Sequence, residues 1–339
     1  MSGARVGLIG YGLAGEVFHA PLIASEPGLD LALIVTGNPE RRERAERGHP
    51  DAAVLGTVDE LWARAGELDL VVVAAPNRAH VPLAEAAIEA RVPVVVDKPL
   101  AGTAAEARRL VEAAERAGVM LTVFQNRRFD GDFLTARRLI EQGELGNVFR
   151  WESRFERWEP QLEEGWRELA AAEEGGGVLL DLGSHLVDQA LQLFGPARTV
   201  YGELDSRRAG AQVDDDAFVA ITHESGVRSH LWMSATAAQL GPRFRVLGDR
   251  AAFVKYGLDP QEPALAAGAR PGDAGWGLEP DELWGLLGTV DATQRVPTEA
   301  GAYERFYARV AAALRDDGPP PVDPRDSVAA LEVLDAARR

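Results

Sequence analysis

The glycine-rich turn Gly10-Tyr11-Gly12-Leu13-Ala14-Gly15 constrains the fold of this chain more than any other feature. It follows an apolar run, residues 5–9, that predicts a strand, and it precedes a helical stretch beginning at Glu16. Glycines at these three positions allow a tight turn, let a pyrophosphate approach backbone N–H groups, and let a helix pack closely on a strand. The start of the chain therefore predicts a dinucleotide-binding α/β unit.

Strand and helix patterns alternate from this turn to residue 124. A helix is expected to follow the capping box Thr103-Ala104-Ala105-Glu106. The series predicts a doubly wound parallel sheet and a dinucleotide-binding domain over residues 1–124. Further strands are expected at 29–35, 68–74, 92–96 and 119–124, and a helix near 80–89.

The end of the second strand bears on the choice of cofactor. An acidic residue there would bind an adenosine ribose and repel a 2′-phosphate, but the chain has Thr36-Gly37-Asn38-Pro39. Thr36 and Asn38 could donate hydrogen bonds to a phosphate, and Arg41 or Arg42 could neutralise its charge. This pattern favours NADP over NAD, with a solvated charged helix as the alternative.

A second strand end carries a lysine. The valine-rich run 92–96 ends in Asp97-Lys98-Pro99, and a lysine in this position lies either at the surface or in a polar site. Ligands of open parallel sheets bind beyond the carboxyl ends of the strands, so Lys98 is expected at the edge of a cleft. The segment Ala75-Pro76-Asn77-Arg78-Ala79-His80 follows another strand on the same side, with His80 as a helix-start cap or a ligand neighbour.

After residue 125 the pattern changes to alternation of apolar and polar residues. In residues 148–158, Phe149, Trp151, Ser153 and Phe155 alternate with charged residues, which indicates a strand with one half-exposed face. Residues 125–339 are therefore predicted to form an α+β domain with a largely antiparallel sheet. Hairpins are expected at 218–234 and 244–256, an ordered loop region at 257–288 that packs through its tryptophans, and helices at 303–314 and after 323.

The segment Gly175–Gly195 is predicted to be a helix with a narrow polar stripe. At helical spacing Asp181, His185, Asp188 and Gln192 fall within about 40° of one another, with apolar residues on both sides. Such a stripe lines a cleft or a buried network. Asp181 is expected to raise the pKa of His185 and orient it for proton transfer, while a buried histidine in an interdomain network is the alternative. A metal site would need a third ligand, and none is recognisable.

Composition excludes several classes of function. The net charge of −17 argues against nucleic-acid and anionic membrane partners, and the absence of cysteine excludes disulfides and a cysteine nucleophile. No apolar run approaches the roughly 18 residues of a membrane span, and residues 6–9 are too short for a signal-peptide core. A cytoplasmic protein is expected.

The motifs occur in the order seen in the glucose-fructose oxidoreductase/inositol dehydrogenase/MocA (Gfo/Idh/MocA) family, which the whole chain resembles. Three segments, Phe18–Ile23, Trp151–Phe155 and Lys255–Gln261, are similar to the NADP-dependent scyllo-inositol 2-dehydrogenase branch of the family. The motifs that carry the family resemblance are Gly10 to Gly15, Ala75 to His80, Asp97-Lys98-Pro99, Asn126-Arg127-Arg128 and Asp181 with His185.

The resemblance implies a Rossmann domain, an open-faced second sheet, and a final helix, residues 323–338, that packs back on the first domain. It implies that Lys98 binds the reacting hydroxyl near the nicotinamide, with Asp97 in place of the family's usual glutamate. His185 matches the general base, and Asp181 matches a carboxylate that assists it or holds the substrate. Asn126 and Arg127 fall where cofactor and substrate meet.

The expected activity is the NAD(P)-dependent interconversion of a secondary alcohol and a ketone on a cyclic polyol or sugar, with an inositol-type substrate favoured. The alternatives are an NAD-dependent glycosidase that uses transient oxidation and a non-enzymatic dinucleotide sensor. A homodimer or homotetramer is expected through the half-exposed sheet face. The substrate is expected to contact Lys98, Asn126, Asp181 and His185. The cofactor is expected to contact Gly10, Tyr11, Gly12, Leu13, Ala14, Gly15, Thr36, Asn38, Arg41, Ala75, Pro76, Asn77, His80, Asp97, Lys98 and Arg127.

Overall fold

The first sheet has six parallel strands in the order β3-β2-β1-β4-β5-β6. We analysed a computed structural model that describes residues 3–162 and 176–339. The strand order is that of a doubly wound dinucleotide-binding sheet, in which the ligand lies at the switch point between β1 and β4, so the predicted fold of this half is confirmed. The strands are β1 (Ala4–Ile9), β2 (Leu29–Val35), β3 (Ala53–Leu55), β4 (Leu70–Val73), β5 (Val94–Asp97) and β6 (Leu121–Phe124).

The helices of this half begin where the local sequence predicts. The Thr103 hydroxyl oxygen accepts a hydrogen bond from the Glu106 N–H at 3.3 Å, which caps α5. The helix after the glycine turn differs slightly, because it starts with a π-helical turn at Ala14 instead of at Glu16. The helical segments are η1 (Ala14–His19), α1 (Ala20–Ala24), α2 (Pro39–Gly48), α3 (Val58–Trp62), η2 (Ala65–Glu67), η3 (Asn77–Ala79), α4 (His80–Glu89) and α5 (Ala104–Ala117).

The second sheet has eight strands in the order β14-β13-β12-β11-β7-β10-β9-β8. Within the described residues, β7 and β10 are the only parallel neighbours of this sheet, so the predicted mainly antiparallel sheet and both predicted hairpins are confirmed. The strands are β7 (Val148–Glu156), β8 (Ala197–Asp205), β9 (Asp216–His223), β10 (Arg228–Ser234), β11 (Phe244–Gly248), β12 (Ala252–Lys255), β13 (Gly285–Gly288) and β14 (Thr293–Val296).

Two details of the second half differ from expectation. The stretch 257–288, expected to be a loop region, contains α10 (Gln261–Ala266) and η6 (Asp281–Leu283) and ends in β13, which pairs with β12 and β14. Phe149 is half exposed although its alternation predicts burial. The ladder between β7 and β11 skips this residue, so Phe149 is the extra residue of a β-bulge, which turns its side chain out of the core.

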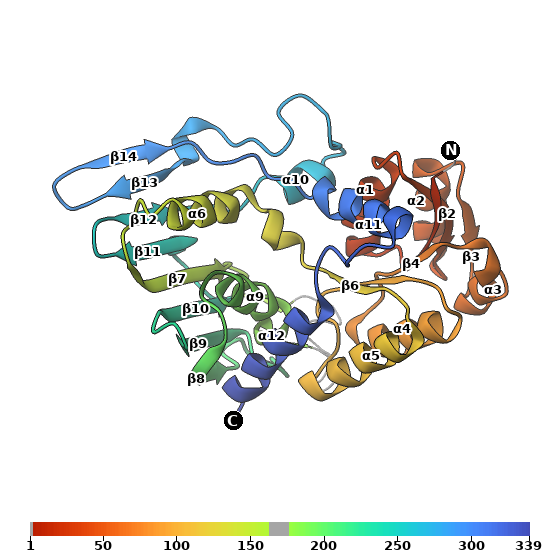
Figure 1. Cartoon of the computed structure of the whole chain (residues 1–339), viewed down its shortest axis with the longest axis horizontal. Coiled ribbons are helices and arrows are strands. Elements are labelled where there is room, and N and C mark those ends of the chain that lie inside the picture. Colours follow the sequence, from red (N-terminus) through yellow and green to blue (C-terminus); the bar gives the residue numbers. More distant parts are fainter. Residues whose placement is uncertain (1–2, 163–175) are drawn as a thin grey trace.

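The last helices of the chain reach both sheets. α11 (Glu304–Asp316) buries Phe306, Tyr307 and Val310 in the core on one face of the first sheet, together with α1. α12 (Pro324–Ala337) packs between α5 and α9 (Gly183–Phe194), as Figure 1 shows, in a core that continues into the second sheet. The remaining segments are η4 (Asn126–Phe129), α6 (Gly131–Glu141) and α8 (Val178–Asp181). A domain boundary at residues 124 and 125 stays a prediction.

No helix in the described ranges is both long and apolar enough to span a membrane.

Candidate active site

Two connected cavities lie at the carboxyl end of the first sheet. The larger has a volume of about 840 Å³ and extends over the glycine turn and the end of β2. The smaller, of about 110 Å³, lies between the first sheet, β7 and α9. Their walls share Leu13, Ala14, Asp97, Lys98 and Asp181, so Lys98 stands where the two cavities meet.

Most residues expected at the cofactor line the larger cavity. The sequence did not indicate its other wall, formed by Thr57 and Val58 at the start of α3, Trp62, and Leu83 and Ala86 of α4. Apolar helical residues of this kind have the pattern of ordinary core. The expected residues that do line it are Gly10, Tyr11, Gly12, Leu13, Ala14, Thr36, Asn38, Arg41, Ala75, Pro76, Asn77, Asp97 and Lys98.

Three residues expected at the cofactor lie elsewhere. A Cβ at Gly15 would come within 2.0 Å of the Gly10 carbonyl oxygen, so Gly15 allows the close turn without lining the cavity. His80 is only 1% exposed and lies behind the cavity wall, with its ring nitrogens against two backbone carbonyls. Arg127 lines the smaller cavity instead.

At the end of β2 the structure separates the two arginines. Arg42 binds Glu46 and the Val54 carbonyl, whereas Arg41 lines the larger cavity, with its guanidinium 3.6 Å from the position of a Cβ at Gly12. The Asn38 side-chain oxygen accepts a hydrogen bond from the Arg41 N–H at 3.0 Å and caps α2. Among the described residues of this cavity wall, the only carboxylates are Asp97 and Asp181, and neither is near β2 in sequence.

Lys98 lies in a polar site and not at the open surface. Its Nζ donates hydrogen bonds to the Asp181 carboxylate at 2.7 Å and to the Asp181 carbonyl oxygen at 2.8 Å. The lysine side chain is 14% exposed and the aspartate side chain 22% exposed. At such partial burial the ion pair fixes the ammonium group at the junction of the cavities.

His185 lines the smaller cavity, but its environment differs from the expected one. The predicted continuous helix is interrupted at Leu182, and Asp181, at the end of α8, directs its carboxylate to Lys98. Burial, followed by the charges of Lys98, Arg127 and other arginines, holds the pKa of His185 well below the usual value. The expectation that Asp181 raises this pKa is wrong. Gly175, the first residue of the predicted helix, lies outside the described residues.

The other two residues of the predicted polar stripe, Asp188 and Gln192, bind side chains outside the cleft. Arg128 donates a hydrogen bond from Nε to the Asp188 carboxylate at 2.7 Å and also binds Asp326 at the start of α12. Gln192 donates to the same Asp326 carboxylate at 3.2 Å. Asp188 and Gln192 therefore tie α9 to η4 and α12, and only Asp181 and His185 reach the cleft.

The smaller cavity has further polar walls that the sequence did not reveal. Glu262, from α10, pairs with Arg127, which also donates a hydrogen bond to the Tyr303 hydroxyl at 3.0 Å. Arg157 follows β7 and lines the same cavity as Asn126. Glu262 lies in a glycine- and proline-rich stretch without a recognisable motif, so nothing in the sequence indicates it.

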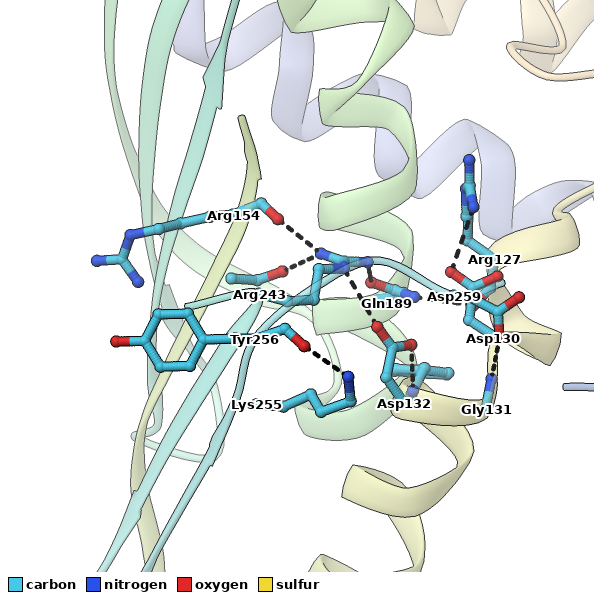
Figure 2. A network of polar contacts seen from close by, with 12 residues as sticks. Arg127, Asp130, Gly131, Asp132, Arg154, Gln189, Arg243, Lys255, Tyr256 and Asp259 are labelled. Carbon is cyan, nitrogen blue, oxygen red and sulfur yellow. Dashed lines mark hydrogen bonds and ion pairs between the residues drawn. The ribbon is translucent and has the colours of Figure 1, made fainter. Parts of the chain in front are cut away.

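A buried polar network surrounds Arg243 and contacts α9 through Gln189 (Figure 2). Arg243, the residue before β11, donates hydrogen bonds to Gln189 on α9 at 3.0 Å and to Ser153 on β7 at 2.8 Å, and lies 3.6 Å from the Asp132 carboxylate. Burial and then the charge of Asp132 raise the pKa of Asp259 to about 6. The network fixes α9, the helix that carries His185. Over the described ranges no three His, Asp or Glu side chains group as a metal site would require.

Comparison with known proteins places the chain in a family. Residues 4–125 match the model of the oxidoreductase family's NAD-binding Rossmann fold, and residues 137–339 match its C-terminal alpha/beta domain. The chain is 40% identical over 335 residues to the uncharacterized oxidoreductase YdgJ of Escherichia coli K12, covering 98% of this chain and 94% of YdgJ.

A second relative has a named activity. The chain is 34% identical over 338 residues to the scyllo-inositol 2-dehydrogenase (NADP(+)) IolW of Bacillus subtilis, covering 98% of this chain and 92% of IolW. The solved structure of the oxidoreductase yvaA from Bacillus subtilis superposes with a TM-score of 0.93 at 32% identity, over 100% of this chain and 96% of the other. The chain therefore belongs to the Gfo/Idh/MocA family and is an NAD(P)-dependent oxidoreductase.

Proposed function

We propose that the protein reversibly oxidises a secondary alcohol on an uncharged cyclic polyol or sugar, with an inositol-type substrate favoured. The observation that carries this proposal is the position of Lys98, which joins the large cavity to the pocket that contains His185. The name of IolW supports the inositol class. The volume, the glycine turn and the backbone-lined walls of the large cavity fit a dinucleotide.

The dinucleotide, when bound, supplies the hydride acceptor. His185 is neutral at pH 7 because its pKa is lowered, so it can accept the hydroxyl proton of the substrate. The positive charge of Lys98 stabilises the developing alkoxide of the substrate. Asp181 holds the Lys98 ammonium group in place. A dinucleotide held along the glycine turn would accept the hydride that leaves the alcohol carbon as the ketone forms.

The charges of the smaller cavity favour an uncharged substrate. Each of the three cations in its described wall forms an ion pair with a carboxylate. Because each described cation of the pocket already has a counter-charge, a sugar acid or phosphate would have to compete with a protein carboxylate for it. The pairs are Lys98 with Asp181, Arg127 with Glu262, and Arg157 with Glu159.

The test of this function is a panel of inositols and aldoses with NADP and NAD in parallel, followed at 340 nm. Formation of reduced cofactor with a polyol supports the proposal. Release of sugar from glycosides without net reduced cofactor would instead support the glycosidase alternative. Lys98 and His185 meet at one pocket, which argues against a sensor that only binds the dinucleotide.

We propose NADP as the preferred cofactor, with Arg41 as the group that binds the 2′-phosphate. Replacing Arg41 with alanine is expected to raise the KM for NADP by roughly 10-fold, the equivalent of one charge-assisted contact of about 1.4 kcal/mol, and to leave the KM for NAD nearly unchanged. Arg42→Ala is the matched control because Arg42 binds Glu46 and Val54 instead. An equal effect of Arg41→Ala on both cofactors would contradict the assignment.

We propose that two or four copies associate through the outer face of the second sheet. On this face the Arg154 guanidinium lies 3.9 Å from the centre of the Trp232 ring, and the Phe218 ring lies 5.1 Å from it. The expected result is a mass of two or four times 36.5 kDa by light scattering, reduced to a single chain by Trp232→Glu. Val290→Glu, at an exposed hairpin tip, is the control. A wild-type monomer would refute the proposal.

A further inference from the structure

Two buried histidines outside the proposed reaction flank the segment Asp97-Lys98-Pro99. His80, the first residue of α4, places Nδ1 at 2.7 Å from the Pro99 carbonyl oxygen and Nε2 at 2.9 Å from the Ala75 carbonyl oxygen. The side chain therefore connects the lysine segment to the loop after β4 that lines the dinucleotide cavity.

His19 lies on the other side of the segment and is fully buried. Its Nδ1 lies 2.6 Å from the Tyr307 hydroxyl on α11, and its Nε2 lies 3.7 Å from the Asp97 carboxylate. That same carboxylate oxygen accepts a hydrogen bond from the Lys98 backbone N–H at 2.9 Å. A chain of contacts thus runs from Tyr307 through His19 and Asp97 to the backbone of Lys98.

We propose that His19 and His80 are positioning residues that hold the segment 97–99 from its two sides and thereby direct the Lys98 ammonium group. This role rests on the proposed function of Lys98. The ammonium group of a lysine stands at the end of a flexible four-carbon chain. Its position is therefore defined only if the backbone that carries the side chain is fixed. His80 contacts the backbone carbonyl of Pro99, which follows Lys98, and His19 contacts the carboxylate of Asp97, which precedes it.

In each histidine, one of the two ring nitrogens contacts the segment 97–99. Burial lowers the pKa of His80, while the charge of Asp97 and the contacts with the Pro99 and Ala75 carbonyl oxygens act in the opposite direction. The nitrogen that faces the Pro99 carbonyl oxygen is Nδ1. At His19 the carboxylate of Asp97 favours the proton on Nε2, and Nδ1 then accepts a hydrogen bond from Tyr307. Burial tends to raise the pKa of Asp97, but the neighbouring His19 and the charge of Lys98 lower it overall.

Amide side chains distinguish the two nitrogens. The nitrogen of asparagine can occupy the place of histidine Nδ1, and that of glutamine the place of Nε2. His80→Asn is therefore expected to keep kcat within about 3-fold of the wild type, while His80→Gln lowers it by about 10- to 100-fold, the range for a misplaced catalytic group. At His19 the order is reversed, with Gln tolerated and Asn impaired.

His223→Gln is the matched control. His223 is also a buried histidine with both ring nitrogens bound, at 2.8 Å to the Gly195 carbonyl oxygen and 2.7 Å to the Ser229 hydroxyl, but it lies in the second sheet. Its replacement is expected to lower Tm without changing kcat, KM or the pH profile. A purely structural role of His19 and His80 would give this same result.

Hydrogen exchange of the backbone amides of residues 97, 98, 100 and 101 gives a readout that does not need a substrate. Exchange is expected to be faster in His80→Gln than in His80→Asn, and faster in His19→Asn than in His19→Gln. Equal exchange and equal kcat within each pair, or the same order at both positions, would overturn the proposal. If one variant does not fold, the pair at the other position decides. A wild type that oxidises no polyol would refute the proposed function, while the exchange order would still test the histidines.

Discussion

Replacing Lys98 with methionine is expected to lower kcat for the polyol by at least ~10²-fold, the loss associated with removing one electrostatic donor from a developing oxyanion. The substitution keeps an unbranched side chain that is one atom shorter, and it removes the charge that Asp181 holds at 2.7 Å. Binding of reduced cofactor, measured by its fluorescence, should change much less, because most of the large cavity is formed by other residues. A drop in kcat with nearly unchanged cofactor affinity is the expected combination.

The chain offers a closely matched control, because its only other lysine is Lys255. Lys255 is also buried, and its ammonium group donates to the Tyr256 carbonyl oxygen at 2.6 Å and to Glu279 at 3.1 Å, in the second sheet. Lys255→Met leaves a buried carboxylate unpaired and should destabilise the fold by about 3–5 kcal/mol without slowing the folded enzyme. Unchanged turnover of Lys98→Met would remove Lys98 from the mechanism.

Replacing His185 with asparagine is expected to lower kcat/KM by roughly 10²- to 10⁴-fold, the usual contribution of general acid–base catalysis. In the wild type, the plot of kcat/KM against pH should also fall at a lower pH than an ordinary histidine base would give. Only the neutral imidazole accepts a proton, and its lowered pKa keeps it neutral as the pH falls through about 6.5, where an ordinary histidine is half protonated. Polyol oxidation should therefore hold its kcat/KM at pH 6.5 and decline only in more acidic buffer.

The measurement is kcat/KM between about pH 5 and 9, the range in which a histidine base is expected to control the rate. His223→Asn serves as the control for loss of a buried histidine elsewhere, and it should retain the wild-type profile. An inflection at or above the usual histidine pKa would show that the positive surroundings of His185 do not act as described. Full activity of His185→Asn would exclude it as the base.

Much of the first sheet could be predicted because its signals are local. The strand at 29–35 and the helix at 80–89 have the predicted bounds, since a run of apolar residues and a proline near a helix start need no distant partner. The glycine turn and the lysine at the end of β5 could likewise be assigned to one cleft from strand order alone.

The parts that failed depend on contacts between distant segments. The interruption at Leu182 turns Asp181 towards Lys98, and helical spacing cannot show it. Glu262 reaches the pocket because α10 packs near η1, a contact between segments about 240 residues apart. His80 was expected at the cofactor, but its ring faces two backbone carbonyls that come together only in the folded sheet.

The packing of α11 and α12 affects how the protein is made. Both helices leave the ribosome long after every strand of the first sheet, yet Phe306, Tyr307 and Val310 complete the core on one face of that sheet. The nascent Rossmann half therefore exposes apolar surface until α11 has been synthesised, a state in which partly folded chains aggregate or bind chaperones. A stop codon shortly before residue 303 should yield a chain in which one face of the first sheet stays uncovered, because α11 is missing. Every strand of that sheet is nevertheless present in such a chain.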